Sequence, residues 1–308
     1  MTTMTQSRLS RREFATLVAG APLVLSRRAP AAPLTAGDLL ARMRQHLGVP
    51  WKVDTIDGIK AGDPTVAVTG VVTTALASLA VLRQAVEAGA NVVVTHEPAF
   101  YASDDARVPP PARGGFQTTP PPGAETRPDP VYAAKNGFVD RHRLVVVRLR
   151  DHWRARQPSP FAQALGVALG WQNHQADNAV TCEIPLVALD RLASHVGRTL
   201  GVRGGMRVMG SPGSAIRRVA LLPGSTPLQA ALDALPGVDA IIAGEVREWE
   251  TVEYARDVIH AGHHKGLLLV GRIVSEEPGM RACADWMKSF VSEVPVRHIG
   301  AGDPYWRP

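Results

Sequence analysis

Cysteine is scarce in this sequence: Cys182 and Cys283 are the two examples in 308 residues. They form no CxxC pair, which excludes a zinc site built on thiolates and a dithiol redox motif. An exported location would permit one disulfide between them. The sequence leaves open whether these two residues meet.

Long apolar runs and a strong excess of one charge are also missing. A membrane-spanning helix needs about 20 apolar residues, and the run near the N-terminus is much shorter, so no membrane span is predicted. The net charge is +6, but residues 1–34 hold five arginines and one glutamate, so +4 belongs to that segment and +2 remains. The basic pI therefore gives little support to a nucleic-acid partner. What remains of that interpretation is the Arg-rich segment 148–156 with Trp153 as a stacking residue.

The N-terminal segment has the pattern of an export signal. It contains SRREF at 10–14, a short apolar run and the small residues APAA at 29–32. This order is typical of a secretory signal, and two arginines with Phe two residues later resemble the twin-arginine motif. The sequence predicts a twin-arginine-type signal peptide at 1–34 and a periplasmic or extracellular protein. An amphipathic N-terminal helix is the alternative.

The remaining residues, 36–308, have the composition of a folded globular chain and are predicted to form an α/β domain. Apolar spacing predicts a helix at 36–47, a strand at 65–72, a helix at 73–88 and a strand at 91–95. Strand, helix and strand at this spacing form a βαβ unit with parallel strands. Parallel strands are covered on both faces, which accounts for the unbroken VVV at 92–94.

The same alternation returns after a Pro- and Gly-rich insertion at 103–130, which is predicted to be a lid or a surface loop. The later predicted strands are 144–149, 219–222, 240–243 and 267–270. The later predicted helices are 131–136, 161–169, 185–200, 227–235, 251–261 and 280–290. The sequence therefore predicts an α/β fold of two similarly built lobes around largely parallel sheets.

Polar side chains follow several of these strands, and ligands of open α/β sheets gather beyond the carboxyl ends of strands. The residues that share this placement are His96, Glu97, Arg150, Asp151, His152, Glu245, Arg272 and Glu276. Imidazole and carboxylate groups are ligands for zinc, iron or manganese, and a neighbouring carboxylate can act as a base. Each residue also has a plainer interpretation, as a capping group, a first-turn acid or part of a solvated ion pair.

The order of these motifs resembles the Nif-three-like family, also labelled the GTP cyclohydrolase type-two-like proteins. The matching stretches are VVVTHEPAFY, VVRLRDHWRAR, IIAGEVREWE and VGRIVSEEPGM, together with the helix TTALASLAVLRQAVEAGA. They cover about residues 65–287. The resemblance implies an α/β fold, a pair of divalent cations in a cleft, a hydrolase label and a ring-shaped homo-oligomer.

The resemblance also implies roles for individual residues. His96 takes the place of the family's first His, and Glu97 the place where most members have a second His; a carboxylate still binds a hard cation. Asp151 and His152 lie in the middle segment, and which of them would be the ligand stays open. Glu276 takes the place of the late Glu. Glu245 is the candidate general base.

Two arginines depart from the family pattern. Arg272, four residues before Glu276, stands where the family has its His. Relatives that share the HEP and SEE sequences tend to have His at the place of Arg150. A guanidinium offers donors only and cannot ligate a cation. We therefore expect one or both metal positions to be lost, with Arg150 and Arg272 holding carboxylates or a small anionic molecule. The alternative, that His263 or His264 fills the gap, is less favoured because their loop precedes a strand and should lie at the opposite sheet edge.

Two functions remain open. One is an exported metal-dependent hydrolase of a nucleotide-like or phosphorylated small molecule, with His96, Glu97, Glu276 and the 151–152 pair holding at least one cation. The other is a non-enzymatic ligand-binding protein whose site is remodelled and depleted of metal.

Overall fold

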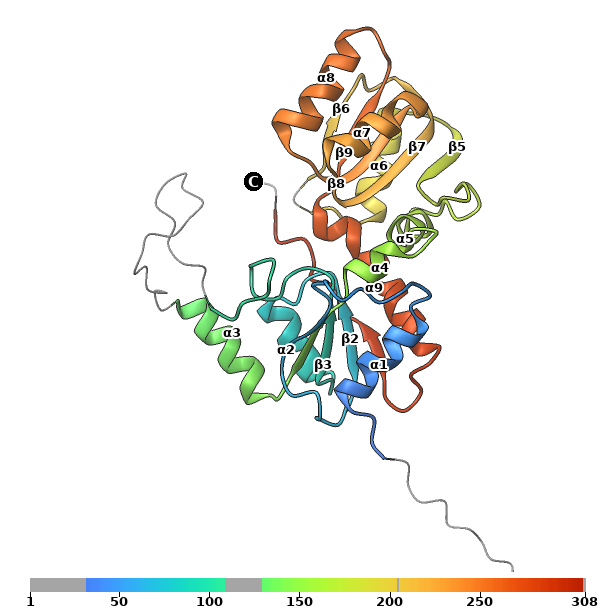
Figure 1. Cartoon of the computed structure of the whole chain (residues 1–308). Coiled ribbons are helices and arrows are strands. Elements are labelled where there is room, and N and C mark those ends of the chain that lie inside the picture. The colour runs from blue at the N-terminus through green and yellow to red at the C-terminus, as the bar shows by residue number, and fades with distance from the viewer. Residues whose placement is uncertain (1–31, 109–128, 204, 307–308) are drawn as a thin grey trace, which may run out of the picture. The chain divides into compact units, whose positions relative to one another are not determined.

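The computed structural model describes residues 32–108, 129–203 and 205–306. The predicted signal sequence, apart from its last few residues, and most of the 103–130 insertion lie outside these ranges. Residues from Leu34 onward form one unit that contains two five-stranded sheets (Figure 1). Among the described helices, none has the length and apolar character needed to cross a membrane.

The first sheet has the strand order β1-β4-β3-β2-β10. Its strands are β1 (Gly58–Ala61), β4 (Val145–Arg148), β3 (Val92–Thr95), β2 (Val71–Thr74) and β10 (Val296–His298). The pairs from β4 to β10 are parallel, and β1 is antiparallel to β4. The predicted parallel arrangement of the central strands is confirmed.

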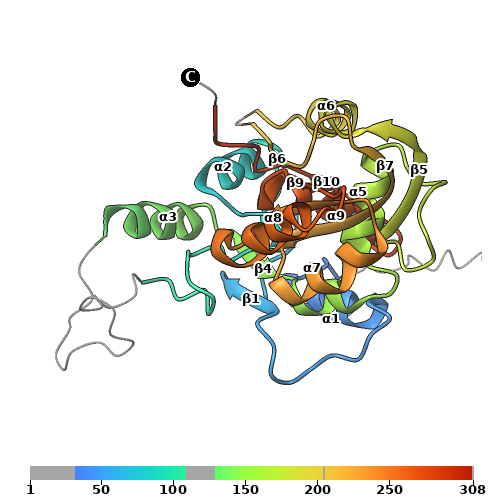
Figure 2. The same cartoon turned by 90° about the horizontal axis from the view of Figure 1, so that it is seen from above.

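Helices cover both faces of this sheet, which explains its uninterrupted valines. Val92 and Val94 belong to the core under α1 (Ala36–His46) and α9 (Arg272–Lys288). Val93 points the other way, into the core under α2 (Leu79–Glu87) and α3 (Pro130–Arg141). Side chains alternate along a strand, so a strand buried on both faces needs apolar residues at every position. Both views show α1 and α2 on opposite sides of the sheet (Figures 1 and 2).

The second sheet repeats this construction with the order β5-β7-β8-β9-β6. Its strands are β5 (Thr181–Ala188), β7 (Ala215–Ser225), β8 (Ala240–Glu245), β9 (Gly266–Leu269) and β6 (Arg207–Met209), with β7, β8 and β9 parallel. One face packs against α5 (Pro160–Ala168) and α6 (Leu189–Thr199). The other packs against α7 (Leu228–Ala234) and α8 (Glu253–His260). The expectation of two similarly built α/β lobes is therefore confirmed.

Several boundaries differ from the sequence prediction. The strand predicted at 65–72 and the helix predicted at 73–88 meet later in the chain, because β2 runs to Thr74 and α2 begins at Leu79 behind the cap Ser78. The β-branched segment 71–74 is hydrogen-bonded on both sides, by β3 and β10, which outweighs a helical pattern. The helix predicted at 185–200 begins at Leu189, since the residues before it pair with β7.

The helix α9 also begins earlier than predicted, at Arg272 rather than at 280, and it contains Pro278. It contacts strands of both sheets, β2 and β10 in the first and β7 and β8 in the second. Short strands at the sheet edges, β1, β6 and β10, have no clear sequence signal at three or four residues each. Cys182 and Cys283 are both buried and free, in two separate cores, so the permitted disulfide is not formed.

Candidate metal centre

His96 and Glu97 directly follow β3, and backbone hydrogen bonds to the end of β2 and the residue after it hold them in place. The backbone N–H of His96 donates to the carbonyl of Thr74 at 3.2 Å, and that of Glu97 to the carbonyl of Ala75 at 2.8 Å. The Thr95 hydroxyl donates to the Glu97 carbonyl at 3.0 Å. The chain therefore continues the sheet's hydrogen bonding for two residues beyond the strand, and both side chains leave from a fixed backbone.

Buried charges secure the loop that follows Pro98. Asp105 accepts from the backbone N–H of Ala99 at 2.7 Å and pairs with Arg148 at 2.9 Å. The Lys135 amine donates to the carbonyl of Ala99, and burial lowers the pKa of Lys135 to about 8. Arg148 is fully buried in this arrangement, which removes it from any nucleic-acid surface built on segment 148–156.

The third group, Glu276, enters from the first half of α9, where Gly224 of β7 makes room for it. Gly224 has φ +83, and a Cβ at this position would lie 2.4 Å from the Glu276 Oε1. The Gly224 N–H donates to the Ser275 hydroxyl at 2.9 Å, which ties the strand to the helix. Glycine is the residue that permits both this backbone angle and this close approach. The sequence analysis missed Gly224 and Ser275 because neither belongs to a motif of ligands.

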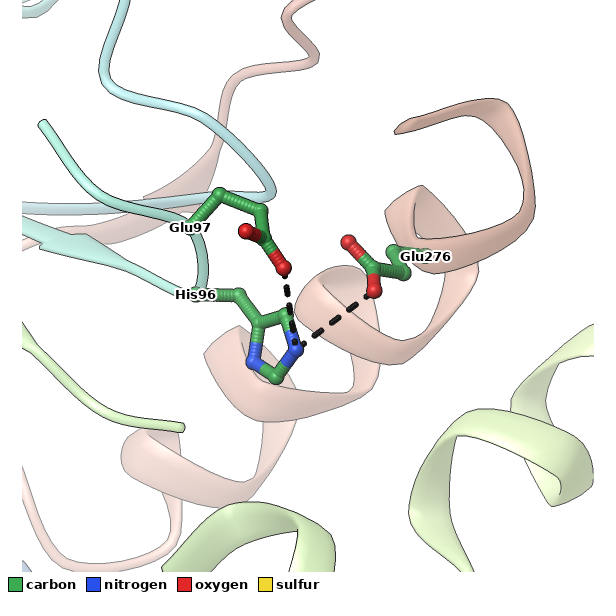
Figure 3. A group of neighbouring side chains, drawn as sticks. All are labelled: His96, Glu97 and Glu276. Carbon is green, nitrogen blue, oxygen red and sulfur yellow. Dashed lines mark ion pairs between the residues drawn. The ribbon is translucent and has the colours of Figure 1, made fainter. Parts of the chain in front are cut away.

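His96, Glu97 and Glu276 come together in one buried group (Figure 3). Their exposed fractions are 0%, 5% and 1%, and their ligand-type atoms all lie within 4.8 Å of one another. The His96 Nε2 is 3.7 Å from the Glu97 Oε1 and 3.6 Å from the Glu276 Oε1. Among the described residues, these three are the ones that could share a cation.

Several polar atoms of this group have no hydrogen-bond partner among the described residues. Both ring nitrogens of His96 and both carboxylate oxygens of Glu276 are in this state. An unpaired buried polar group costs about 1–3 kcal/mol, so a cluster of them needs an explanation. A divalent cation would satisfy one imidazole nitrogen and the carboxylate oxygens together, and this donor set suits zinc, iron or manganese. The residues present therefore fit a cation.

The protonation of His96 is compatible with this role. Burial holds the pKa of His96 well below its usual value, and the positive charges of Arg154, Arg150 and Arg272 lower it further. The backbone of Leu149 opposes this shift, but it lies outside hydrogen-bonding geometry, since both ring nitrogens lack a partner. The ring is thus neutral at neutral pH and carries a free lone pair.

Glu276 has the opposite shift. Burial, and next the charge of Glu97, raise the pKa of Glu276 to about 8, against the lowering effect of Arg272, Arg154 and Arg150. Without a cation, Glu276 is therefore largely protonated at neutral pH. A cation that binds here has to displace this proton.

Arg272 lies at the edge of the group. Its guanidinium donates to the Glu97 Oε1 at 2.6 Å and to the Glu245 Oε1 at 3.0 Å. Its Nε is 4.0 Å from the Glu276 Oε1. Arg272 therefore supplies one fixed positive charge beside these carboxylates.

Asp151 and His152 lie elsewhere. The Nδ1 of His152 contacts the Asp57 Oδ2 at 2.7 Å, and its Nε2 accepts from the backbone N–H of Lys52 at 2.8 Å. The Asp151 carboxylate accepts from the Thr55 hydroxyl at 2.9 Å. Both nitrogens of His152 are thus occupied, and the pair holds the 52–57 loop rather than joining the other predicted ligands.

Asp57 completes this second cluster, and the sequence analysis missed it. Its carboxylate also accepts from the backbone N–H groups of Arg150, Asp151 and His152 at 2.6, 3.1 and 2.9 Å, at the start of α4 (Asp151–Ala155). Trp51 stacks on His152 with ring centroids 3.9 Å apart. No sequence pattern links Asp57 to residues about ninety positions later.

The remaining predicted site residues surround the group. Glu245, at the end of β8, is half-exposed and reaches the group through Arg272. Arg150 lies close enough for its charge to lower the pKa of His96 and of Glu276. His263 and His264 lie on the exposed loop before β9 and are not part of the group.

Comparisons with known proteins are informative at the level of structure. No family model matches the sequence, and a search of curated proteins found no match. A Bacillus cereus protein related to NIF3 has 13% identity, a TM-score of 0.66, and coverage of 89% of this chain and 99% of its own. The Staphylococcus aureus hypothetical protein SA1388 has 16% identity, a TM-score of 0.64, and coverage of 90% and 100%.

A third structure, the protein ybgI of unknown function, has 22% identity, a TM-score of 0.61, and coverage of 88% and 99%. At such low identity these structures inform about the arrangement of the chain and not about its chemistry. The fold that the resemblance implied is confirmed: this chain has the α/β fold seen in NIF3-related structures.

Proposed function

We propose that the protein binds one divalent cation at His96, Glu97 and Glu276. The observation that carries this proposal is the set of unpartnered, buried ligand atoms on His96 and Glu276, which lie within 4.8 Å of a Glu97 oxygen. Three protein ligands leave coordination positions open, which is typical of catalytic rather than structural sites. Arg272 limits the site to one cation, because its guanidinium already neutralises Glu97 and Glu245.

The function we propose for this site is metal-dependent hydrolysis of a nucleotide-like or otherwise phosphorylated small molecule. A bound zinc, iron or manganese ion would supply Lewis-acid chemistry. Glu245 is the candidate general base, since it is half-exposed and can exchange protons with solvent. Arg272 holds Glu245 beside the site, and its charge favours an anionic substrate.

Metal content tests the first part of this proposal. After exposure to manganese or zinc and removal of excess ion, elemental analysis should find about one ion per chain. An Arg272→His variant should raise this number towards two, while Arg83→His on the exposed side of α2 should leave it unchanged. No retained ion in the parent protein would contradict the proposal. Hydrolysis is then measured as loss of substrate, followed by chromatography, over a panel of nucleotides and phosphomonoesters, with and without the retained ion.

The second candidate function is a non-enzymatic ligand-binding protein with a metal-depleted site. It is favoured by one observation, the 2.6 Å contact of Arg272 with Glu97, which gives that carboxylate a charged partner without metal. This candidate predicts an empty site after the same metal treatment and no loss of any substrate in the panel.

We also propose export and self-association. The SRREF sequence and the apolar run after it support export through the twin-arginine pathway, to the periplasm or beyond. Replacing Arg11 and Arg12 by Lys should retain the protein in the cytoplasm, as judged by cell fractionation. The resemblance to Nif-three-like proteins supports a homo-oligomer, and light scattering during size-exclusion chromatography tests it against the 32.9 kDa of one chain.

A further inference from the structure

A cavity of about 670 Å³ lies beside the candidate metal centre and carries an excess of positive charge. Its basic lining residues are Lys52, Arg150, Arg154 and Arg247, against the two acids Asp151 and Glu250. Glu250 pairs with Arg247 at 2.9 Å, whereas Asp151 accepts a hydrogen bond from the neutral Thr55 hydroxyl and keeps its negative charge. Three cations, on Lys52, Arg150 and Arg154, therefore face one carboxylate, and the lining carries a net charge of +2.

These three cations have no carboxylate partner among the described residues. No ion pair within 4.0 Å involves any of them in the ranges that the structure covers. They are also held near one another by the second cluster. Lys52 is anchored through its backbone to His152, while Arg150 and Arg154 lie one helical turn apart at α4, with the Arg154 N–H on the Arg150 carbonyl at 2.9 Å. Like charges held together without direct ion pairs favour an anion between them.

A second, smaller cavity lies between this cavity and Glu276, and the two share part of their lining. This smaller cavity, of about 160 Å³, is lined by Glu276 and Phe161, and it shares Arg154 with the larger one. The turn at 225–227 also borders both. The charge of Arg154 acts on both His96 and Glu276. A molecule held by Arg154 would therefore have its other end next to the ligand group.

A second large cavity, about 660 Å³ between α5 and α9, lacks this property. Its two arginines, Arg156 and Arg281, are matched by the two acids Glu277 and Asp285, so its lining carries no net charge.

We propose that Lys52, Arg150 and Arg154 form a phosphate-binding subsite that holds the phosphate of a small-molecule substrate while its remainder extends towards Glu276. Phosphate fits better than carboxylate because three separate cations converge, and phosphate has three oxygens and up to two charges for them. Arginine's planar fork matches two of those oxygens at once. This inference rests on the proposed function in naming the substrate of that site, but the subsite itself requires no metal.

Inorganic phosphate is the probe, and calorimetric titration of the full chain is the measurement. Metal-free protein should bind phosphate, and Arg150→Gln or Arg154→Gln should each weaken this binding by about tenfold, as expected for loss of one charge-assisted contact. Arg83→Gln, an exposed arginine on α2, is the matched control and should not change the affinity. Each variant's unfolding midpoint should equal that of the parent.

The outcomes separate this inference from the metal proposal. Phosphate binding to metal-free protein that each arginine variant weakens about tenfold supports the subsite, whether or not any metal is retained. Phosphate binding that requires metal and survives both arginine substitutions would overturn the subsite and leave the metal centre standing. Parent protein that does not bind phosphate at millimolar concentration, with or without manganese, would also overturn it.

Discussion

Two neighbouring strands of the first sheet are followed by similar residues, which differ in their hydrogen-bond partners. After β3 the chain has His96-Glu97, and after β4 it has Asp151-His152. His96 is buried with neither ring nitrogen in a hydrogen bond, whereas His152 is buried with both nitrogens occupied. A histidine and an acid at a strand end therefore do not define a ligand. What defines one is whether the rest of the fold supplies competing hydrogen-bond partners.

The pairs His96-Glu97 and Asp151-His152 also have different roles at the candidate site. His96 and Glu97 meet Glu276 from α9 to form the cation group. Asp151 and His152, with Asp57, fasten the loop that carries Lys52 and the helix that carries Arg154. In the proposed function the first pair therefore binds the cation, and the second pair positions the loop and the helix. The following substitutions test this difference between the two pairs.

Removing His96 should have the largest effect on metal. His96→Ala deletes the one imidazole of the group, so retained metal should fall from about one ion per chain to none, measured by elemental analysis after dialysis. The unfolding free energy of the metal-free protein should change less than in a typical core truncation, because the substitution also removes two buried ring nitrogens that have no hydrogen-bond partner. Metal retention equal to that of the parent would contradict the assignment.

His152→Ala should show the reverse. It removes contacts to Asp57 and to Lys52 and the stack on Trp51, so the unfolding free energy should fall by about 3 kcal/mol, measured by urea denaturation. Retained metal should stay at about one ion per chain. His260→Ala, an exposed residue at the end of α8, is the control and should change neither quantity. A loss of metal in His152→Ala without loss of stability would restore His152 as a ligand.

The metal affinity should depend on pH through Glu276. Its pKa of about 8 in the metal-free protein means that a cation competes with one proton below that pH. The apparent affinity should therefore rise about tenfold per pH unit as pH increases towards 8 and level off above it. His96 adds no slope in this window because its pKa lies well below the usual value. Competition titrations with a chelating dye measure the profile, and a flat profile from about pH 6 to 8 would disagree with this account.

Gly224→Ala should have the smallest effect of these four. The added methyl would lie 2.4 Å from the Glu276 Oε1, and the backbone is at φ +83, so the carboxylate must move. We expect a loss of about 1 kcal/mol in stability and a several-fold weaker metal affinity. Gly213→Ala, where an added methyl meets nothing within 4 Å and φ is not positive, is the matched control. Equal metal affinity in the two variants would show that Gly224 does not shape the site.

The sequence was sufficient for the architecture and for half of the site. Unbroken valines at 92–94 and the alternation of strands and helices predicted parallel sheets with helices on both faces, which the structure confirms. The four-residue spacing of Arg272 and Glu276 fits the helix found there, although that helix was predicted to begin only at 280. These features depend on local periodicity, which a sequence displays directly.

The remaining features of the fold and the site depend on contacts between residues that lie far apart in the sequence. Asp57 engages His152, and Gly224 makes space for Glu276, across separations that no periodic pattern records. The boundary of β2 was missed for a related reason, because hydrogen bonds from β3 and β10 extend the strand through Thr74. The availability of a ligand atom is a property of the folded surroundings, so it could not be predicted from the residue type.

The most direct test of the central claim is the position of a bound ion. Crystals of the protein soaked with manganese or zinc, measured at that metal's absorption edge, should give one anomalous peak per chain within ligand distance of the His96 ring, Glu97 and Glu276. A peak at His152 and Asp57, or no peak at these three residues despite full soaking above pH 8, would contradict the account.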